Sequence, residues 1–184
     1  MRNSLWEKRI PTLAGLFLLI IAIGITTLFT QYGRGLLGRA GPTEVPRNVK
    51  ITNVTSSSFT VSWTTEEAVT GSIKVGETAE NTERAILDER DIRSESTGRY
   101  QVHSVTAINL KPTTTHYFTI LSGANVYDNN GVVYSVSTGK QLPEGGRKER
   151  SIGGTVLLEN GEPARGVLVI LTMDGAQPLS ALSK

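Results

Sequence analysis

Cysteine is absent from this 184-residue sequence, and histidine occurs only twice. The lack of cysteine excludes disulfide bonds, cysteine-type zinc sites, iron–sulfur clusters and thiol nucleophiles in any compartment. An exported part of the chain must therefore fold by burial of apolar side chains alone. The composition is otherwise ordinary, with 38% hydrophobic, 20% charged and 6% aromatic residues, which excludes a disordered or collagen-like chain.

A basic surplus is also missing from most of the chain, although the formal net charge is +2. Residues 1–41 contain five bases and one acid, so the totals of 19 bases and 17 acids leave 14 bases and 16 acids elsewhere. The basic character therefore belongs to a short terminal segment. The remainder lacks the positive charge that nucleic-acid binding requires, and we expect no nucleic-acid partner.

No charged residue occurs between Ile10 and Gly33, and the centre of this stretch is strongly apolar. As a helix, the roughly 20 residues from Ile10 to Phe29 would cover about 30 Å, the thickness of the hydrocarbon core of a bilayer. We therefore predict a transmembrane helix at residues 10–32 that contacts the lipid bilayer, preceded by a cytoplasmic tail at residues 1–9.

A cleavable signal peptide is the main alternative, because Arg2, Lys8 and Arg9 precede the apolar run. We favour an uncleaved anchor, since the best small-residue cleavage site, Gly38-Arg39-Ala40, lies well beyond that run. The basic flank favours a cytoplasmic N-terminus. The expected location is the cell membrane, with a single span and with most of the chain extracellular.

Glycine and proline are frequent between residues 33 and 45, which we interpret as a flexible tether. Beyond it the hydrophobic period becomes two, which is typical of half-buried strands. The expected strands contain, in order, Val49 and Ile51; Phe59, Val61 and Trp63; Ile73 and Val75; Tyr100 to Ala107; His116 to Ile120; and Val132 to Thr138. Asn130-Gly131 predicts a type I′ turn in a hairpin between Tyr127 and Tyr134.

Six or seven short strands in about 95 residues indicate an antiparallel sandwich, because each strand needs a second sheet to cover its apolar face. The sequence from Asn53 to Trp63, followed by Leu110-Lys111-Pro112 and the strand after it, resembles a fibronectin type III domain over residues 46–139. The resemblance implies that Trp63 lies in the core between the sheets, and we place it beside His116 and Phe118.

The strand His103-Ser104-Val105 and the following Leu110-x-Pro112 are similar to the sandwich that precedes the catalytic domain of purple acid phosphatases. One position departs from the general family pattern. His116 stands where the resemblance implies the tyrosine of the tyrosine corner, with Tyr117 beside it. Imidazole can still donate one hydrogen bond to a backbone carbonyl, although it covers less apolar surface than a phenol ring.

The segment between Gly76 and Thr97 is strongly polar and carries alternating charges. We interpret it as an elongated connection that contains a helical turn or a short edge strand, with its charges solvated. Residues 140–150 form a polar linker with two adjacent glycines.

A second pattern begins after the linker. Ile152-Gly153-Gly154-Thr155-Val156, Gly161-Glu162-Pro163 and the strand Leu168 to Leu171 resemble the opening of a carboxypeptidase regulatory-like domain. That family has a small transthyretin-like sandwich, and residues 151–184 are too few to close one. We therefore expect an incomplete domain with an unpaired apolar edge at Val167 to Leu171, and a longer parent protein.

The sequence predicts no catalytic, cofactor-binding or metal-ligating residue and no cofactor. His103 and His116 could share a metal with carboxylates, but packing on neighbouring strands explains them better. The loop Asp128-Asn129-Asn130-Gly131 could hold calcium weakly, but a hairpin turn explains it better. Asn53-Val54-Thr55 is formally a glycosylation sequon, and under the prokaryotic export that we favour it is simply a turn.

The predicted fold class is thus all-β: a transmembrane helix, an antiparallel immunoglobulin-like β-sandwich and an incomplete second β-sandwich. The first functional hypothesis is a non-enzymatic surface protein whose sandwich modules serve as spacer, adhesion or binding scaffold, with an extracellular protein or glycan ligand. The second is an anchored hydrolase or metallophosphatase-type enzyme whose catalytic domain lies beyond residue 184. Fold alone does not decide between them.

Overall fold

The computed structural model describes residues 15–17, 19–23, 43–143 and 152–184. Residues 15–17 and 19–23 are helical, and the rest of the expected span at 10–32 lies outside the described residues, as do the tail at 1–9 and most of the tether. No helix within the described part of the chain has the length and apolarity to cross a membrane. The chain divides into two compact units, and the second, Thr43–Lys184, carries the sheets.

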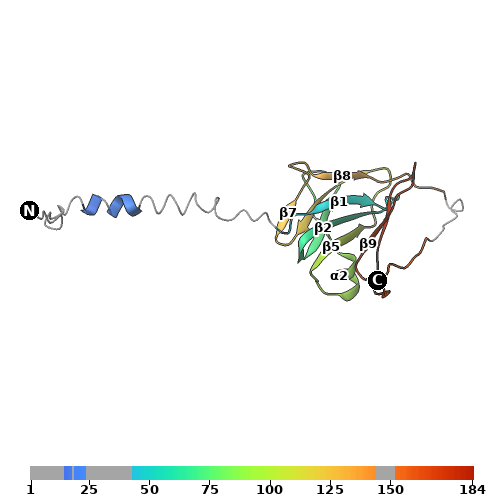
Figure 1. Cartoon of the computed structure of the whole chain (residues 1–184). Helices are drawn as coiled ribbons and strands as arrows, with labels where there is room; N and C mark the ends of the chain where they lie inside the picture. The colour runs from blue at the N-terminus through green and yellow to red at the C-terminus, as the bar shows by residue number, and fades with distance from the viewer. Residues whose placement is uncertain (1–14, 18, 24–42, 144–151) are drawn as a thin grey trace, which may run out of the picture. The chain divides into compact units, whose positions relative to one another are not determined.

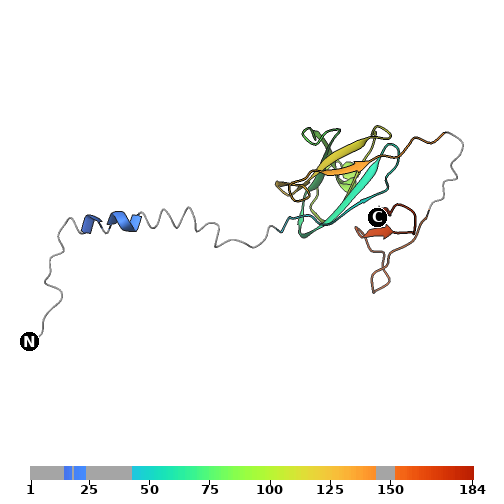
Figure 2. The ribbon, with the colours of Figure 1, turned by 90° about the horizontal axis from the view of Figure 1, so that it is seen from above.

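Two antiparallel sheets form the main part of residues 43–143, as Figures 1 and 2 show. The first sheet contains β1 (Arg47–Thr52), β2 (Phe59–Val69) and β5 (Tyr100–Ala107), in that spatial order. In the second sheet, β4 (Arg84–Leu87), β3 (Gly71–Gly76) and β6 (Thr115–Ser122) lie side by side, and the far edge of β6 pairs with β7 (Asn125–Tyr127) and β8 (Tyr134–Ser137). The expected antiparallel β-sandwich is confirmed.

β7 and β8 together form one interrupted edge strand. Tyr127 pairs with Ile120 of β6, and Tyr134 pairs with Phe118, so both short strands run along the same side of β6. The residues between them protrude as a small loop closed by a bridge from Asn129 to Val132. Within it Asn130 has φ 55° and Gly131 has φ 88°, the positive values that a type I′ turn requires, so the predicted turn is confirmed. The predicted hairpin between Tyr127 and Tyr134 is wrong, because β7 and β8 pair with β6 and not with each other.

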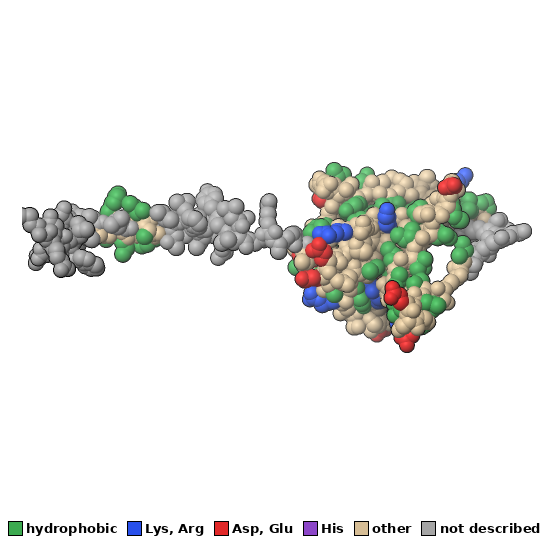
Figure 3. Space-filling model, viewed as in Figure 1, with side chains coloured by type: hydrophobic (Ala, Val, Ile, Leu, Met, Phe, Trp, Pro, Cys, Tyr) green, Lys and Arg blue, Asp and Glu red, His purple; other side chains and the backbone are tan. Residues whose placement is uncertain are grey.

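The core lies between the two sheets, because alternate residues of each strand point inward. On the outer face that Figure 3 shows, hydrophobic side chains are scattered among polar and charged ones. Trp63 is fully buried, and its indole ring stacks on the imidazole of His103 at a centroid distance of 4.7 Å. The placement of Trp63 in the core is therefore confirmed, but its stacking partner is His103. Phe118 belongs to the same core, and its ring centre lies 5.5 Å from that of Phe59 and 5.1 Å from that of Tyr134. The core also contains Val61, Ile73, Val75, Ile86, Val105, Ala107, Leu110 and Ile120.

The polar connection between β3 and β5 forms both a short strand, β4, and a short helix, α2 (Glu89–Ser94). Asp88 is the N-cap of α2, and its side chain accepts a hydrogen bond from the backbone N–H of Arg90. The expectation that the charges of this segment are all solvated is wrong. Asp88 and Asp91 are both buried, since the helix presents them to β5.

The C-terminal segment, residues 152–184, contains a two-stranded sheet of β9 (Leu168–Leu171) and β10 (Leu179–Leu182). β9 coincides with the predicted strand, and β10 pairs antiparallel with one of its edges along its whole length. The expected unpaired edge is therefore wrong for that side of β9, while the other side has no partner strand among the described residues. β10 has no β-branched residue, so its sequence gives a weak strand signal. The described residues contain no second sheet facing this one, so the predicted second sandwich is not shown.

We predict that Trp63→Ala lowers the free energy of unfolding by about 3 to 5 kcal/mol, because it removes the largest buried ring and leaves a cavity. The midpoint of urea unfolding measures this change. Trp63→Phe is the control. It keeps an aromatic ring over His103 and removes an indole N–H that has no hydrogen-bond partner among the described residues. A loss in Trp63→Phe equal to that in Trp63→Ala would contradict the burial argument.

Candidate functional site

The register of the strands sets two opposite ends of the sandwich. The chain enters at Glu44, whose carboxylate accepts hydrogen bonds from the turn between β6 and β7, at Ala124 and Asn125. That turn adjoins Ser122 of β6, which pairs with Gly71 at the start of β3. The other end of β6 pairs with Gly76, where the loop between β3 and β4 begins. This second end, which we call the distal end, lies one strand length from the entry point.

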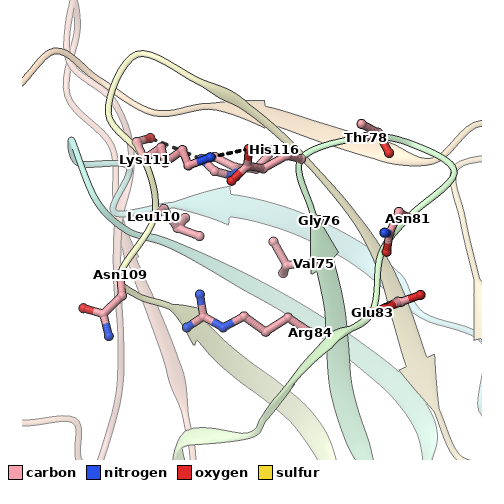
Figure 4. Close-up of a pocket in the computed structure, with 11 residues that line it drawn as sticks. Val75, Gly76, Thr78, Asn81, Glu83, Arg84, Asn109, Leu110, Lys111 and His116 are labelled. Carbon is pink, nitrogen blue, oxygen red and sulfur yellow. Dashed lines mark hydrogen bonds and ion pairs between the residues drawn. The ribbon is translucent and has the colours of Figure 1, made fainter.

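A cleft of about 420 Å³ opens at the distal end, between the loop from β3 to β4 and the loop from β5 to β6 (Figure 4). Its floor is formed by three buried side chains, Val75, Leu110 and His116. Two side-chain amides stand on opposite sides of it, Asn81 on the first loop and Asn109 on the second. The cleft thus combines an apolar floor with hydrogen-bonding groups on its walls, as small-molecule sites commonly do.

The two cations of the cleft are held by neighbouring groups. Arg84 donates from Nη2 to the carbonyl of Ile108 at 2.7 Å, and Lys111 forms an ion pair with Glu77 at 2.8 Å. Glu83 is the second acid that lines the cleft, so two acids balance the two bases. This arrangement suits a polar ligand without net charge. The residues that line the cleft contain no nucleophile hydrogen-bonded to a base, the arrangement that nucleophilic catalysis needs.

His116 performs the structural role that the tyrosine corner implies. Its Nε2 lies 3.2 Å from the carbonyl oxygen of Lys111, five residues upstream, and donates to it in the tautomer with a proton on Nε2. The hydroxyl of Thr138 donates to the same carbonyl at 2.6 Å. The expected hydrogen bond from imidazole to a backbone carbonyl is therefore confirmed, and it ties β6 to the loop after β5.

A second polar cluster lies between α2 and β5. The carboxylate of Asp88 accepts two hydrogen bonds from the guanidinium of Arg90, at 2.9 and 3.0 Å, and one from the backbone N–H of Ser104 at 3.1 Å. Arg90 also donates to the carbonyl of Val102 on β5. Asp88 and Arg90 thus bind both the N–H and the C=O groups that β5 presents on the side away from β2.

Two opposing effects act on the pKa of Asp88. Burial alone would raise it. The contacts with His103 and Arg90 and the backbone N–H donors of Arg90 and Ser104 lower it more, so the pKa of Asp88 lies well below the usual value of 3.8. Asp88 is therefore ionised at any physiological pH. Its ionised form is the one that stabilises the folded chain.

Asp91 and Tyr100 complete this cluster. Oδ1 of Asp91 accepts hydrogen bonds from the hydroxyl of Tyr100 at 3.0 Å and from the backbone N–H of Gly98 at 2.9 Å. The pKa of Tyr100 is raised, first by burial and then by its hydrogen bond to the Asp91 carboxylate. The guanidinium of Arg90 lies 3.4 Å from the centre of the Tyr100 ring, a cation–π contact. The cluster faces the sheet, and Oδ2 of Asp91 is its one carboxylate oxygen without a hydrogen-bond partner among the described residues.

His103 is fully buried, and its Nδ1 lies 3.7 Å from Oδ2 of Asp88, beyond hydrogen-bond distance. Neither ring nitrogen has a hydrogen-bond partner among the described residues. The ring instead packs between Trp63 and Gly71, and a Cβ at Gly71 would overlap it, which explains glycine at that position. Because this Asp–His pair is closed to solvent, it is a structural contact.

The structure separates the two histidines. His103 lies on β5 and His116 on β6, which belong to different sheets, so the expectation of neighbouring strands is wrong. Within the described ranges, no three histidine, aspartate or glutamate side chains come together to hold a metal ion. In the loop at residues 128–131, the side chain of Asp128 accepts from the backbone N–H of Gly131 at 2.8 Å, as in a hairpin turn.

One local signal in the sequence points to the Asp88 cluster. An aspartate at the start of a short helical stretch is a common N-cap, and Asp88 has that position. Nothing in the spacing of Asp88, Arg90 and Asp91 indicates that all three face a strand that follows about ten residues later. The cleft gave no signal, since its two walls are loops far apart in the sequence.

We predict that Asp88→Asn lowers the free energy of unfolding at pH 7 by about 3 to 5 kcal/mol, because it leaves Arg90 partly buried without its counterion. The pKa of Asp88 is lower in the folded chain, so its ionisation stabilises the fold fully above 3.8. That contribution is lost as the pH falls below 3.8 toward the folded-state pKa. The difference in urea midpoint between the variant and the unsubstituted chain should therefore be constant from pH 7 to about 5 and shrink below pH 4.

Asp128→Asn is the matched control, because it makes the same chemical change at an exposed turn residue. A pH-independent difference for Asp88→Asn, or an equal loss of stability in both variants, would contradict the role of the Asp88 charge.

We also predict that His116→Tyr is neutral or stabilising, because a phenol can donate to the Lys111 carbonyl and covers more apolar surface than imidazole. Urea midpoints and the metal content of both proteins are the measurements. A stoichiometric metal ion that disappears in His116→Tyr would refute the structural role.

No family model matches the sequence, and no curated protein matches it significantly. Solved structures similar to the chain include a fibronectin type III domain of human contactin 1, at 19% identity and a TM-score of 0.35, covering 58% of this chain and 86% of that one. Another is the sensor domain of the anti-sigma factor RsgI4 of Pseudobacteroides cellulosolvens, at 13% identity and a TM-score of 0.34, covering 63% of this chain and 96% of that one. The structural neighbours are fibronectin type III and immunoglobulin-like β-sandwich domains, while the sandwich of this chain is established by its own two sheets and their shared core.

Proposed function

We propose that this protein is a single-pass surface protein of the cell membrane, with its N-terminus in the cytoplasm and a non-catalytic β-sandwich outside the cell. The sandwich serves as a spacer and binding scaffold that presents its cleft at the end opposite to the chain entry. The proposed ligand is an extracellular protein or glycan that contacts the cleft through polar, uncharged groups.

The anchor is supported by the uncharged stretch from Ile10 to Gly33 and by the basic residues before it. Trp6 and Tyr32 stand near its two ends, where aromatic side chains favour the membrane interface.

The observation that carries the scaffold proposal is the opposite placement of the chain entry and the cleft. Glu44 contacts the turn at one end of β6, and the cleft opens at the other end. β6 has eight residues, so about 25 Å separates these ends at roughly 3.4 Å per residue. A domain held at Glu44 therefore presents the cleft at the side remote from its attachment.

The non-catalytic part of the proposal is supported by the polar clusters. The acids and histidines that the fold brings together are engaged in holding its elements: Asp88 and Asp91 fix α2 to β5, and His116 fixes the loop after β5. The apolar strand at β9 supports the finer proposal that residues 151–184 begin a carboxypeptidase regulatory-like domain. The Leu110-x-Pro112 motif supports a sandwich of the phosphatase-associated subtype.

We predict that the full chain stays in the membrane fraction after high-salt and alkaline washing, because the apolar span crosses the bilayer. Two lysines in the span, Ile20→Lys with Ile21→Lys, should reduce the retained fraction, since each charge near the bilayer centre costs roughly 2.5 to 3.5 kcal/mol. The control is Ile152→Lys, at an exposed position of the C-terminal segment. Immunoblotting of washed membranes measures retention.

Protease added outside intact cells should remove the sandwich. Protection from that protease would contradict the proposed orientation, and recovery of a released species beginning near Ala40 would establish signal-peptide cleavage instead.

A further inference from the structure

The outer face of the first sheet is polar and yet buried. Core residues such as Val61 alternate along β2 with Thr60 and Ser62, which point to the opposite face. Thr60 pairs with Thr52 and Thr106, and Ser62 pairs with Ser104, so small hydroxyl residues line this face across three strands. Thr52, Thr60, Ser62 and Ser104 are nevertheless all buried. An outer face is buried only where another part of the molecule covers it.

The C-terminal segment supplies part of this cover, close to the end of β1. The hydroxyl of Ser180 on β10 lies 2.6 Å from that of Thr52. The backbone N–H of Asn53 donates to the carbonyl of Pro178 at 3.1 Å, and the side chain of Gln177 donates to the carbonyl of Val54. Three consecutive residues, Thr52 to Val54, therefore all bind residues between Gln177 and Ser180.

The side chain of Asn53 makes the most specific of these contacts. Its Oδ1 accepts from the backbone N–H of Ser180 at 2.9 Å, and its Nδ2 donates to the backbone C=O of the same residue at 2.9 Å. Nδ2 also lies 3.2 Å from the hydroxyl of Thr60 on β2. The amide thus bonds both main-chain groups of one residue of β10, as a residue of a neighbouring antiparallel strand would.

The backbone conformation brings this amide into position. Asn53 has φ 51°, in the left-handed region that asparagine tolerates better than most residues. Asn48, near the other end of β1, has nearly the same conformation, with φ 54°, but its side chain bonds Thr64 and does not reach the C-terminal segment. The two asparagines therefore differ in their contacts and not in their backbone.

We propose that Asn53 is a latch that joins the C-terminal segment to the sandwich, so that residues 43–143 and 152–184 move as one body although the connector between them contains Gly145 and Gly146. Opening the latch would free the C-terminal segment and uncover the part of the hydroxyl face around Thr52. The amide nitrogen used by the latch is also the atom that the sequon Asn53-Val54-Thr55 would glycosylate, so docking and a glycan at Asn53 exclude each other.

The test compares Asn53→Gly with Asn48→Gly in the full chain, since glycine keeps the positive φ and removes only the side-chain contacts. The first readout is hydrogen exchange of the Ser180 backbone amide, measured by nuclear magnetic resonance or mass spectrometry. We expect exchange about tenfold faster in Asn53→Gly, because the acceptor of that amide is lost, and no change in Asn48→Gly. Equal exchange in both variants would overturn the latch.

The second readout uses the lack of native cysteine. Glu80→Cys on the loop after β3 and Met173→Cys on the C-terminal segment are both exposed and can carry a pair of spin labels. We expect a narrow distance distribution in the otherwise unsubstituted chain and in Asn48→Gly, and a broad one in Asn53→Gly. A distribution already broad without the asparagine substitutions would refute the one-body arrangement. Membrane retention does not depend on Asn53, so failure of the latch and failure of the anchor are distinguishable.

Discussion

The contact between the apolar faces of the two sheets is the interaction on which the other features of residues 43–143 depend. Without cysteine, no disulfide bond can join the sheets, so burial around Trp63, Phe59 and Phe118 must hold them together. The cleft is formed by loops that leave this core at one end, and α2 packs on the sheet that the core supports. The positions of the loops and of the helix therefore follow from the packing of the sheets.

Much of this arrangement could be predicted from the sequence. Alternation of apolar and polar residues is a local signal, and it placed β5 at its observed bounds and β9 likewise. The type I′ turn at Asn130-Gly131 was predicted equally well, because the tolerance for positive φ is a property of single residues. β10 was missed since Leu179-Ser180-Ala181-Leu182 carries no strand-forming bias and owes its strand to pairing with β9.

The polar contacts were less predictable, because they join residues that the sequence keeps apart. His103 stacks on Trp63, forty positions earlier, through pairing of β2 with β5. Asp88 is buried because the helix that it caps lies against β5, and a run of alternating charges does not reveal which of them faces a strand. His116 was the exception. Its role followed from its position in the strand just after the Leu110-Lys111-Pro112 loop and needed no knowledge of distant residues.

The pair Asp88 and Arg90 has a consequence for how copies of this protein behave beside one another. β5 is the last strand of its sheet, and a row of open N–H and C=O groups along such a strand is a template on which a strand of another molecule can add. The carboxylate and the guanidinium already occupy Ser104 N–H and Val102 C=O, and they bring charge to the same edge. An incoming chain would have to displace a paired, partly buried ion pair before its first hydrogen bond could form. The salt bridge that positions α2 in one molecule therefore also opposes edge-to-edge pairing of its sheet with a strand of another molecule.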